Sequence, residues 1–157
     1  MRRAILAIAA LSVLAGCTKK IPNTEIDDTA ENRAIVAVVD AYRKAMDRRD
    51  AVGVLALVSR AYFDDSGTAD PTDDVDYDRL AQQLAATLQK ITAERLELGV
   101  TQISTESDGT NATVRLFFDN YYRIVTPRAE IPKRDSDVHL MKMRREEGGV
   151  WRIASGL

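Results

Sequence analysis

The sequence predicts an α+β domain in which three helices come first and then pack against one antiparallel sheet of four strands. Apolar residues recur at helical spacing in three segments before Glu94, and after it they alternate with polar residues, as is typical of strands. The pairs Asp108-Gly109 and Gly148-Gly149 separate the alternating segments and favour turns. Helices followed by a meander of strands pack naturally as one sheet against the helices.

The first two helices are indicated by the residues at their starts. Asp28 and Glu31 have the spacing of a capping box, and the apolar stripe that follows them includes Tyr42. The charged run at residues 47–50 ends this helix. Asp50, the last residue of that run, can cap a second and shorter helix.

A third helix is expected over residues 77–93, with leucine side chains along one face. An aspartate-rich segment, residues 64–76, precedes it. A calcium site is one interpretation, but glycine and glutamate are missing at the positions that an EF-hand loop requires. We therefore interpret the segment as a solvated acidic loop. In it, Asp64 and Asp65 are expected to face water, with no tyrosine or histidine within hydrogen-bond distance.

The strand pattern begins after the third helix. Four alternating segments predict the strands, and they cover residues 96–100, 114–124, 138–144 and 150–153. Pro127 and Pro132 bound an irregular stretch between the second and third strands. Trp151 shares its strand parity with Ile153, so we expect the indole to be buried against the helices.

The N-terminus has the order of features of a secretory signal peptide. Two arginines precede an apolar run of about a dozen residues, which is shorter than the ~20 residues of a spanning helix, and small residues then lead to Cys17. The run Leu-Ala-Gly-Cys at residues 14–17 resembles the lipobox of bacterial lipoproteins. This resemblance implies that residues 1–16 are removed and that Cys17 carries lipid. Residues 17–29 would then form a lipidated tether.

The same resemblance implies a location. Thr18 follows the cysteine where, in the enterobacterial pattern, an aspartate retains a lipoprotein in the inner membrane. We therefore expect a bacterial lipoprotein of the outer membrane that faces the periplasm. Two or more acyl chains would make this attachment to the membrane essentially permanent.

Charge and composition narrow the classes of partner and cofactor. Lys and Arg total 22 against 24 Asp and Glu, a net charge of −2, which argues against a nucleic-acid binder and against electrostatic adhesion of the whole chain to anionic lipid. Cys17 is the only cysteine and His139 the only histidine, which excludes a structural disulfide and any cluster of cysteine or histidine metal ligands. We expect no metal and no cofactor.

The order of elements over residues 30–157 resembles the nuclear-transport-factor-2-like superfamily, which includes ketosteroid isomerases and polyketide cyclases of the SnoaL type. The resemblance rests on Tyr42 in the first helix, Asp50 at the start of the second, and Gly-Val-Trp-Arg-Ile at residues 149–153. It implies a cone, in which a highly curved sheet folds around the first helix and leaves a pocket at its open mouth. Many members bind small molecules, many only dimerise or scaffold, and a minority are enzymes, so the fold does not decide the function.

Five residues are candidates for the walls of this pocket: Tyr42, Tyr62, Asn120, Tyr122 and His139. His139 alternates with two methionines, and a lone histidine in such a pattern is most often a hydrogen-bonded pocket wall. We therefore favour a non-enzymatic binding or interaction module, which holds a small apolar ligand in the cone or a protein partner on the sheet.

The alternative function is proton transfer of the ketosteroid isomerase type. That chemistry needs a carboxylate base and two hydrogen-bond donors for the enolate oxygen. The resemblance implies Tyr42 and a protonated Asp137 as the donors, and Asp64 or Asp65 as the base. A base in solvent would have an ordinary pKa and would lie outside the cone. This expectation favours the binding module.

The second predicted strand carries a row of aromatic residues. Tyr121 and Tyr122 lie on opposite faces of it, so one of them faces away from the core. An exposed row of Phe117, Tyr121 and Arg123 would suit a homodimer interface. Covering of the sheet by a helix explains the same pattern.

Overall fold

The computed structural model describes residues 19–157, so the predicted signal peptide and the lipid on Cys17 lie outside the described residues. Its elements confirm the predicted fold class, with three helices that precede a four-stranded antiparallel sheet in the order β3-β4-β5-β6. The elements are α1 (Ala30–Asp47), α2 (Ala51–Leu55), β1 (Phe63–Asp64), β2 (Val75–Asp76), α3 (Tyr77–Gln89), β3 (Ile91–Thr105), β4 (Asn111–Val125), β5 (Glu130–Arg145), the 3-10 turn η1 (Glu147–Gly149) and β6 (Trp151–Ser155).

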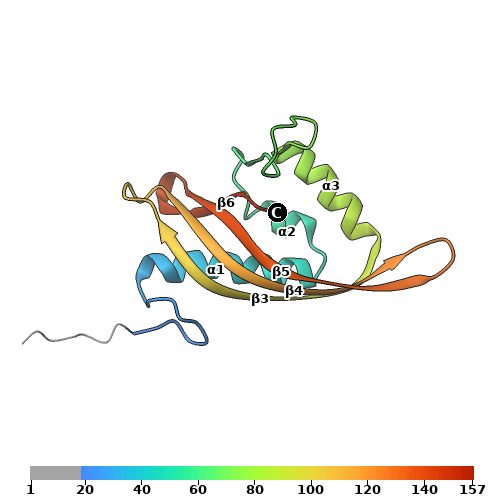
Figure 1. Ribbon diagram of the computed structural model, residues 1–157, viewed down its shortest axis with the longest axis horizontal. Coiled ribbons are helices and arrows are strands. Elements are labelled where there is room, and N and C mark those ends of the chain that lie inside the picture. Colours follow the sequence, from blue (N-terminus) through green and yellow to red (C-terminus); the bar gives the residue numbers. More distant parts are fainter. Residues whose placement is uncertain (1–18) are drawn as a thin grey trace, which may run out of the picture.

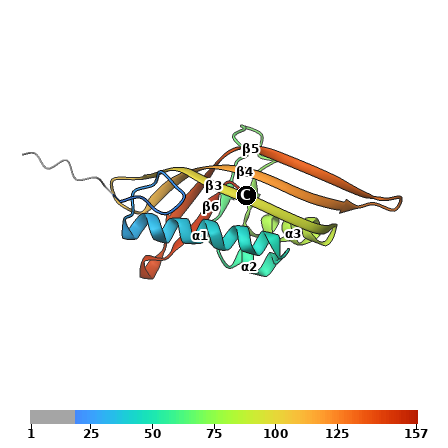
Figure 2. The ribbon, with the colours of Figure 1, turned by 90° about the horizontal axis from the view of Figure 1, so that it is seen from below.

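The sheet is long and curved, and all three helices lie on one side of it (Figures 1 and 2). We call the face toward the helices the inner face and the opposite one the outer face. Among residues 19–157, α1 is the only helix of 18 residues, and none is apolar enough to cross a membrane. The β4–β5 hairpin extends past the end of α3 (Figure 1).

The predicted helix starts are right to within two residues. Thr29, not Asp28, caps α1, because its hydroxyl accepts a hydrogen bond from the Asn32 N–H at 3.0 Å. Asp28 instead forms an ion pair with Arg33. The cap of α2 is confirmed, since Asp50 accepts a hydrogen bond from the Gly53 N–H at 2.8 Å.

The third helix is shorter than expected and ends at Gln89. The reason is tertiary, because Ile91 is buried and pairs with Ile124 of β4. A β-branched residue packs well in a strand, and strand pairing overrides the helical spacing of the last predicted turn.

Of the stretch expected to be irregular, residues 127–129 form the turn between β4 and β5, and residues 130–132 belong to β5, which begins at Glu130. Pro132 lies opposite Arg123 of β4, and β6 pairs with β5 only from Lys142 onward. The other edge of β5 is therefore open beside Pro132, where a missing N–H removes no bond from the ladder. The expectation of an irregular stretch is therefore right for residues 127–129 and wrong for residues 130–132.

The predicted tether is packed over residues 19–28. Ile21 and Ile26 are buried, and the Ile21 N–H donates to the Ile26 carbonyl at 2.8 Å. This loop lies beside Gly99 and Val100 of β3, which is an edge strand of the sheet. Covering an edge strand protects its unpaired backbone groups from association with other chains.

The core lies between α1 and the inner face of the sheet. Its fully buried members include Ile35 of α1, Val114 of β4, Met141 and Met143 of β5, and Ile153 of β6. Trp151 is 3% exposed, which confirms the burial that its strand parity predicts.

A candidate binding cavity between the first helix and the sheet

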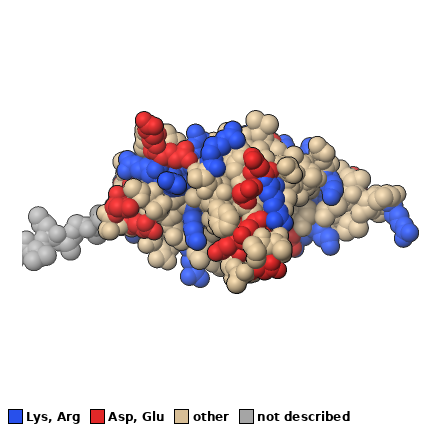
Figure 3. Space-filling model, turned by 90° about the horizontal axis from the view of Figure 1, so that it is seen from above, with Lys and Arg blue, Asp and Glu red and all other residues tan. Residues whose placement is uncertain are grey.

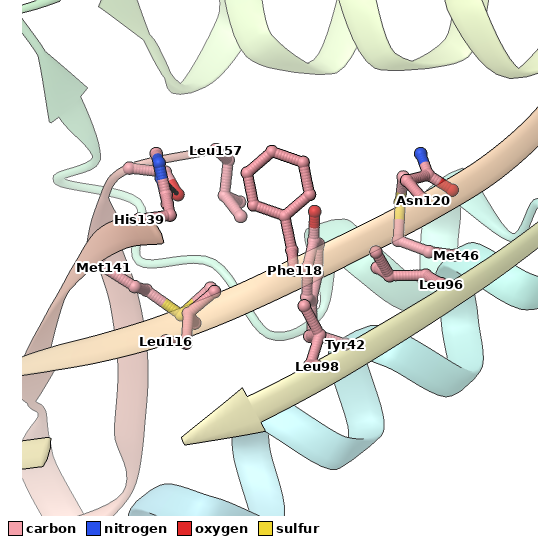
Figure 4. A pocket seen from close by; sticks show the side chains of 11 residues that line it. Tyr42, Met46, Leu96, Leu98, Leu116, Phe118, Asn120, His139, Met141 and Leu157 are labelled. Atoms are coloured by element: carbon pink, nitrogen blue, oxygen red, sulfur yellow. Dashed lines mark hydrogen bonds between the residues drawn. The ribbon is translucent and has the colours of Figure 1, made fainter. Parts of the chain in front are cut away.

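A cavity of about 220 Å³ lies between α1 and the inner face of β3, β4 and β5 (Figure 4). Most of its wall is apolar, and Tyr42, Asn120 and His139 bring polar side chains to it. The residues that line it are Tyr42, Met46, Leu96, Leu98, Leu116, Phe118, Asn120, His139, Met141, Gly156 and Leu157.

The local structure explains why these side chains meet. Every second residue of a strand points to one face, so Leu116, Phe118 and Asn120 follow one another along the inner face of β4. Tyr42 and Met46 are four residues apart on α1 and therefore share the helix face that meets the sheet. The cavity thus forms where the helical repeat of α1 and the strand alternation of β4 turn these side chains toward each other.

Tyr42 directs its hydroxyl into the space beside Phe118 (Figure 4). Burial raises the pKa of Tyr42, and the nearby Glu94 carboxylate raises it further. The phenol therefore keeps its proton at neutral pH. Its hydroxyl is a neutral hydrogen-bond donor and acceptor inside an apolar chamber.

His139 is held in the cavity wall by a hydrogen bond. Its Nε2 lies 2.9 Å from the carbonyl oxygen of Gly156, which can only accept, so Nε2 carries the proton. In the neutral ring, Nδ1 is then an acceptor. The ring also meets the ring of Phe118 edge to face, at 6.3 Å between centroids.

The last two residues close one side of the cavity, and Asp64 fixes their position. The Gly156 N–H donates to Asp64 Oδ2 at 2.6 Å, and the Tyr62 hydroxyl donates to the same oxygen at 3.3 Å. The Leu157 N–H donates in turn to the Tyr62 hydroxyl at 3.1 Å. Gly156 has a positive φ of 89°, and a Cβ there would lie 2.4 Å from the Leu140 carbonyl oxygen, so only glycine fits.

The expectation for Asp64 was therefore wrong, since it is partly buried and hydrogen-bonded to a tyrosine. The short β1–β2 pairing lifts this residue out of the acidic loop and sets it against the end of the chain. Burial raises the pKa of Asp64, but the N–H donors of Gly156 and Ser66 outweigh burial and hold the pKa below its usual value. Asp65 is exposed, as expected, and accepts from the Gly67 N–H.

Of the five candidate pocket residues, Tyr42, Asn120 and His139 line the cavity, and the other two do not. Tyr62 is buried in the core, and its hydroxyl accepts the hydrogen bond from the Leu157 N–H. Tyr122 lies farther along β4, where its hydroxyl donates to Asp135 at 2.6 Å. Asp137, the predicted protonated donor, is exposed on β5 and accepts from the neighbouring Val138 N–H.

Sequence reasoning missed Glu94, which lies beside the polar end of the cavity. Asn120 Nδ2 donates to Glu94 Oε1 at 3.2 Å, whereas Glu94 Oε2 and Asn120 Oδ1 are buried and have no partner within residues 19–157. Burial raises the pKa of Glu94, and the nearby Asp47 carboxylate raises it as well, against the lowering effect of the Asn120 hydrogen bond. The residue escaped notice because it sits at the predicted boundary between helix and strand.

No group of three or more potential metal ligands occurs in the part of the chain that the structure describes. The lining residues include no Lys, Arg, Asp or Glu, and the site consists of apolar walls with the polar side chains of Tyr42, Asn120 and His139. Such a chamber can hold an uncharged molecule by burial of its apolar surface and by a few directed hydrogen bonds.

No protein-family model matches the sequence, and no curated protein matches it. Solved structures do resemble it. A ketosteroid isomerase-like protein from Erwinia carotovora atroseptica superposes with a TM-score of 0.66 at 19% identity, over 82% of this chain and 94% of that one. A conserved protein from Planctomyces limnophilus gives 0.67 at 13% identity, over 81% and 93%.

A protein of the nuclear-transport-factor-2-like family from Streptomyces avermitilis gives a TM-score of 0.62 at 15% identity, over 80% of this chain and 93% of that one. At these identities the likeness concerns the fold. It supports the resemblance seen in the order of the elements. The chain has the α+β fold of nuclear-transport-factor-2-like proteins.

Proposed function

We propose that this chain is a lipid-anchored, non-enzymatic binding module that takes a small, uncharged, largely apolar molecule into the cavity. One observation carries the proposal: an apolar chamber of about 220 Å³ contains a tyrosine hydroxyl and a histidine nitrogen that are available for hydrogen bonding. A dry apolar cavity of ~150 Å³ is enough to bind benzene. A molecule of one or two rings therefore matches the space.

The chemistry of the lining favours an uncharged ligand. Tyr42 stays neutral, and no Lys, Arg, Asp or Glu is among the lining residues. A charged ligand would lose its hydration without gaining an ion pair, which is strongly unfavourable. Tyr42 can donate to a carbonyl or hydroxyl oxygen, and His139 Nδ1 can accept from a hydroxyl.

The positions of the acidic residues support binding over catalysis. A general base must lie within ~3 Å of the proton that it removes, or one water away. Asp64 has Oδ2 occupied by Gly156 and Tyr62, and its lowered pKa makes it a weak base. Asp65 and Asp137 are exposed and do not line the cavity. None of the three aspartates that the isomerase alternative names is therefore placed to act as a base on a ligand in the cavity.

Calorimetric titration with 1-naphthol tests the binding proposal. We expect saturable one-to-one binding, about fivefold weaker in Tyr42→Phe because one hydrogen bond of about 1 kcal/mol is lost. Tyr77→Phe, which removes a hydroxyl outside the cavity, is the matched control. Leu116→Phe should fill the chamber and abolish binding. Equal affinity in all four proteins would refute the site, and isomerase activity lost in Asp64→Asn would refute the non-enzymatic role.

The proposed anchor is lipid on Cys17 in the outer membrane, facing the periplasm. Only Thr18 separates this cysteine from the packed loop that begins at Lys19. Two residues span at most about 7 Å, so the folded domain would lie close to the bilayer surface. Membrane fractionation of the Cys17→Ser variant tests the anchor.

A homodimer is a second proposal, and it rests on the outer face of the sheet. Phe117, Val138 and Leu140 are 45%, 47% and 56% exposed there, an apolar patch of a kind that often marks an interface. Beside them, Arg134 forms two hydrogen bonds with Asp119, at 2.9 and 2.8 Å. Sedimentation equilibrium should give a dimer for the wild type and a monomer for Leu140→Asp. A monomeric wild type would refute this proposal.

A further inference from the structure

The distal part of the β4–β5 hairpin forms a projecting arm, which we define as residues 121–134 (Figures 1 and 2). β3 begins at Ile91, opposite Ile124, so beyond that pair the arm consists of two strands only. The turn at its tip is tightly closed, because both the N–H and the hydroxyl of Thr126 donate to the Ala129 carbonyl.

The arm is basic, although the chain as a whole is acidic. It contains four basic residues and one acidic residue, whereas the whole chain has a net charge of −2. In the space-filling view, Lys and Arg are spread over the visible face, and the narrow end of the molecule shows blue with almost no red (Figure 3). Within residues 19–157, Arg134 is paired with Asp119, but Arg123, Arg128 and Lys133 form no ion pair.

Apolar side chains are exposed on both faces of the arm. Val125 has the parity of the outer face and is 47% exposed, while Ile131 pairs with Ile124 on the inner face and is 41% exposed. A protein partner that docks on a sheet covers one face. Apolar side chains on two opposite faces are instead expected where an apolar environment surrounds the tip on all sides.

We propose that the arm is a membrane contact, with its tip inserted among the headgroups of an anionic bilayer. Val125 and Ile131 would enter the boundary between headgroups and acyl chains, and the three unpaired cations would meet the lipid phosphates. The closed turn leaves few backbone groups at the tip without an internal partner, which insertion requires. The whole-chain charge opposes adhesion, so binding has to be local to the arm.

This contact does not depend on lipid at Cys17. The start of the described chain and the tip of the arm lie at opposite ends of the long axis (Figure 2). If both hold the membrane, the domain lies lengthwise along the bilayer. The arm alone gives weak, salt-sensitive binding, because surface charge is screened within about 10 Å at 0.1 M salt.

Co-sedimentation with vesicles tests the proposal on residues 19–157, which contain every described helix and strand and the core. We expect binding to vesicles of phosphatidylglycerol and phosphatidylcholine, and little to pure phosphatidylcholine. Each cation at the surface contributes roughly fivefold to partitioning. The double variant Arg123→Glu/Lys133→Glu should therefore lower the partition coefficient at least about 25-fold.

Two matched controls carry the same chemical changes away from the arm. Lys142→Glu/Arg144→Glu alters charge equally at the other end of β5, and Val52→Asp matches Val125→Asp at an exposed valine of α2. The controls should bind like the wild type, and Val125→Asp should not bind. Wild-type binding that is absent, or that survives in both arm variants, overturns the proposal. Arm variants that change only the oligomeric state also overturn it, since the arm would then contact protein.

Discussion

Replacing Glu94 with glutamine should stabilise the protein at neutral pH. In the wild type, Glu94 Oε2 and Asn120 Oδ1 are two buried acceptors without a donor. A glutamine keeps the acceptor that Asn120 Nδ2 already uses and adds an N–H₂ group that can donate to Asn120 Oδ1. One substitution would thus satisfy one orphaned acceptor and remove the other, while leaving the volume almost unchanged.

The magnitude follows from the cost of an unsatisfied buried acceptor, which is about 1–3 kcal/mol. Glu94 is only half-buried, so we take the lower end and expect a gain of about 1 kcal/mol at pH 7. For a domain of this size that gain raises Tm by about 4 °C. It also has a definite pH dependence, because the folded pKa of Glu94 is raised above its unfolded value.

A carboxyl with a raised folded pKa stabilises the fold fully below its unfolded pKa, and this stability is lost as pH rises through the folded pKa. The advantage of Glu94→Gln should therefore be large at pH 7 and small at pH 4. Urea unfolding at both pH values measures it. Glu130→Gln, at an exposed glutamate of the arm, is the control and should have no effect. A gain that is equal at both pH values, or a loss at pH 7, would refute the assignment of Glu94.

Three further predictions concern the core, the cavity wall and the proposed anchor. Trp151→Ala should cost ~3–5 kcal/mol, enough to prevent folding, so normal melting by circular dichroism would contradict the burial of the indole. Gly156→Ala should cost at least about 1 kcal/mol in urea and weaken 1-naphthol binding, because its Cβ collides with the chain that walls the cavity; wild-type stability would contradict that contact. Cys17→Ser should release the protein from membranes washed with high salt, and retention would contradict the lipid anchor.

The sequence predicted the parts of this fold in which one periodicity acts alone. Asp50 caps α2, and the alternation around Met141 and Trp151 fixes the inner face of the sheet. The errors lie where two preferences compete. Ile91 continues the apolar stripe of the third helix, but it pairs with Ile124 of β4 as a strand residue. Pro132 is a residue typical of loops, but it lies in β5 at an open strand edge. Such outcomes depend on a partner strand that local sequence does not reveal.

The candidate site divides in the same way. Tyr42 and His139 were predictable, because the helical stripe and the strand alternation point both inward. Asp64 was not, because its position depends on Gly156, which is 92 residues away in the sequence. The acidic composition of the loop predicts that Asp64 faces solvent, but the hydrogen bond from the Gly156 N–H holds this side chain against the end of the chain.

The hydrogen bonds of Asp64 bear on two properties of the site: the position of the cavity wall and the availability of this carboxylate as a base. An aspartate in solvent could swing toward a ligand, but Asp64 is held by the Gly156 N–H and the Tyr62 hydroxyl, and these donors lower its pKa. The same bonds set the chain end against the cavity, where the Gly156 carbonyl orients His139. The carboxylate that the family resemblance offers as a base therefore acts in this chain as a structural clamp. Its contribution to stability is present above the unfolded pKa of aspartate and is lost as pH falls through its lowered folded pKa, so acid should loosen the cavity wall together with the fold.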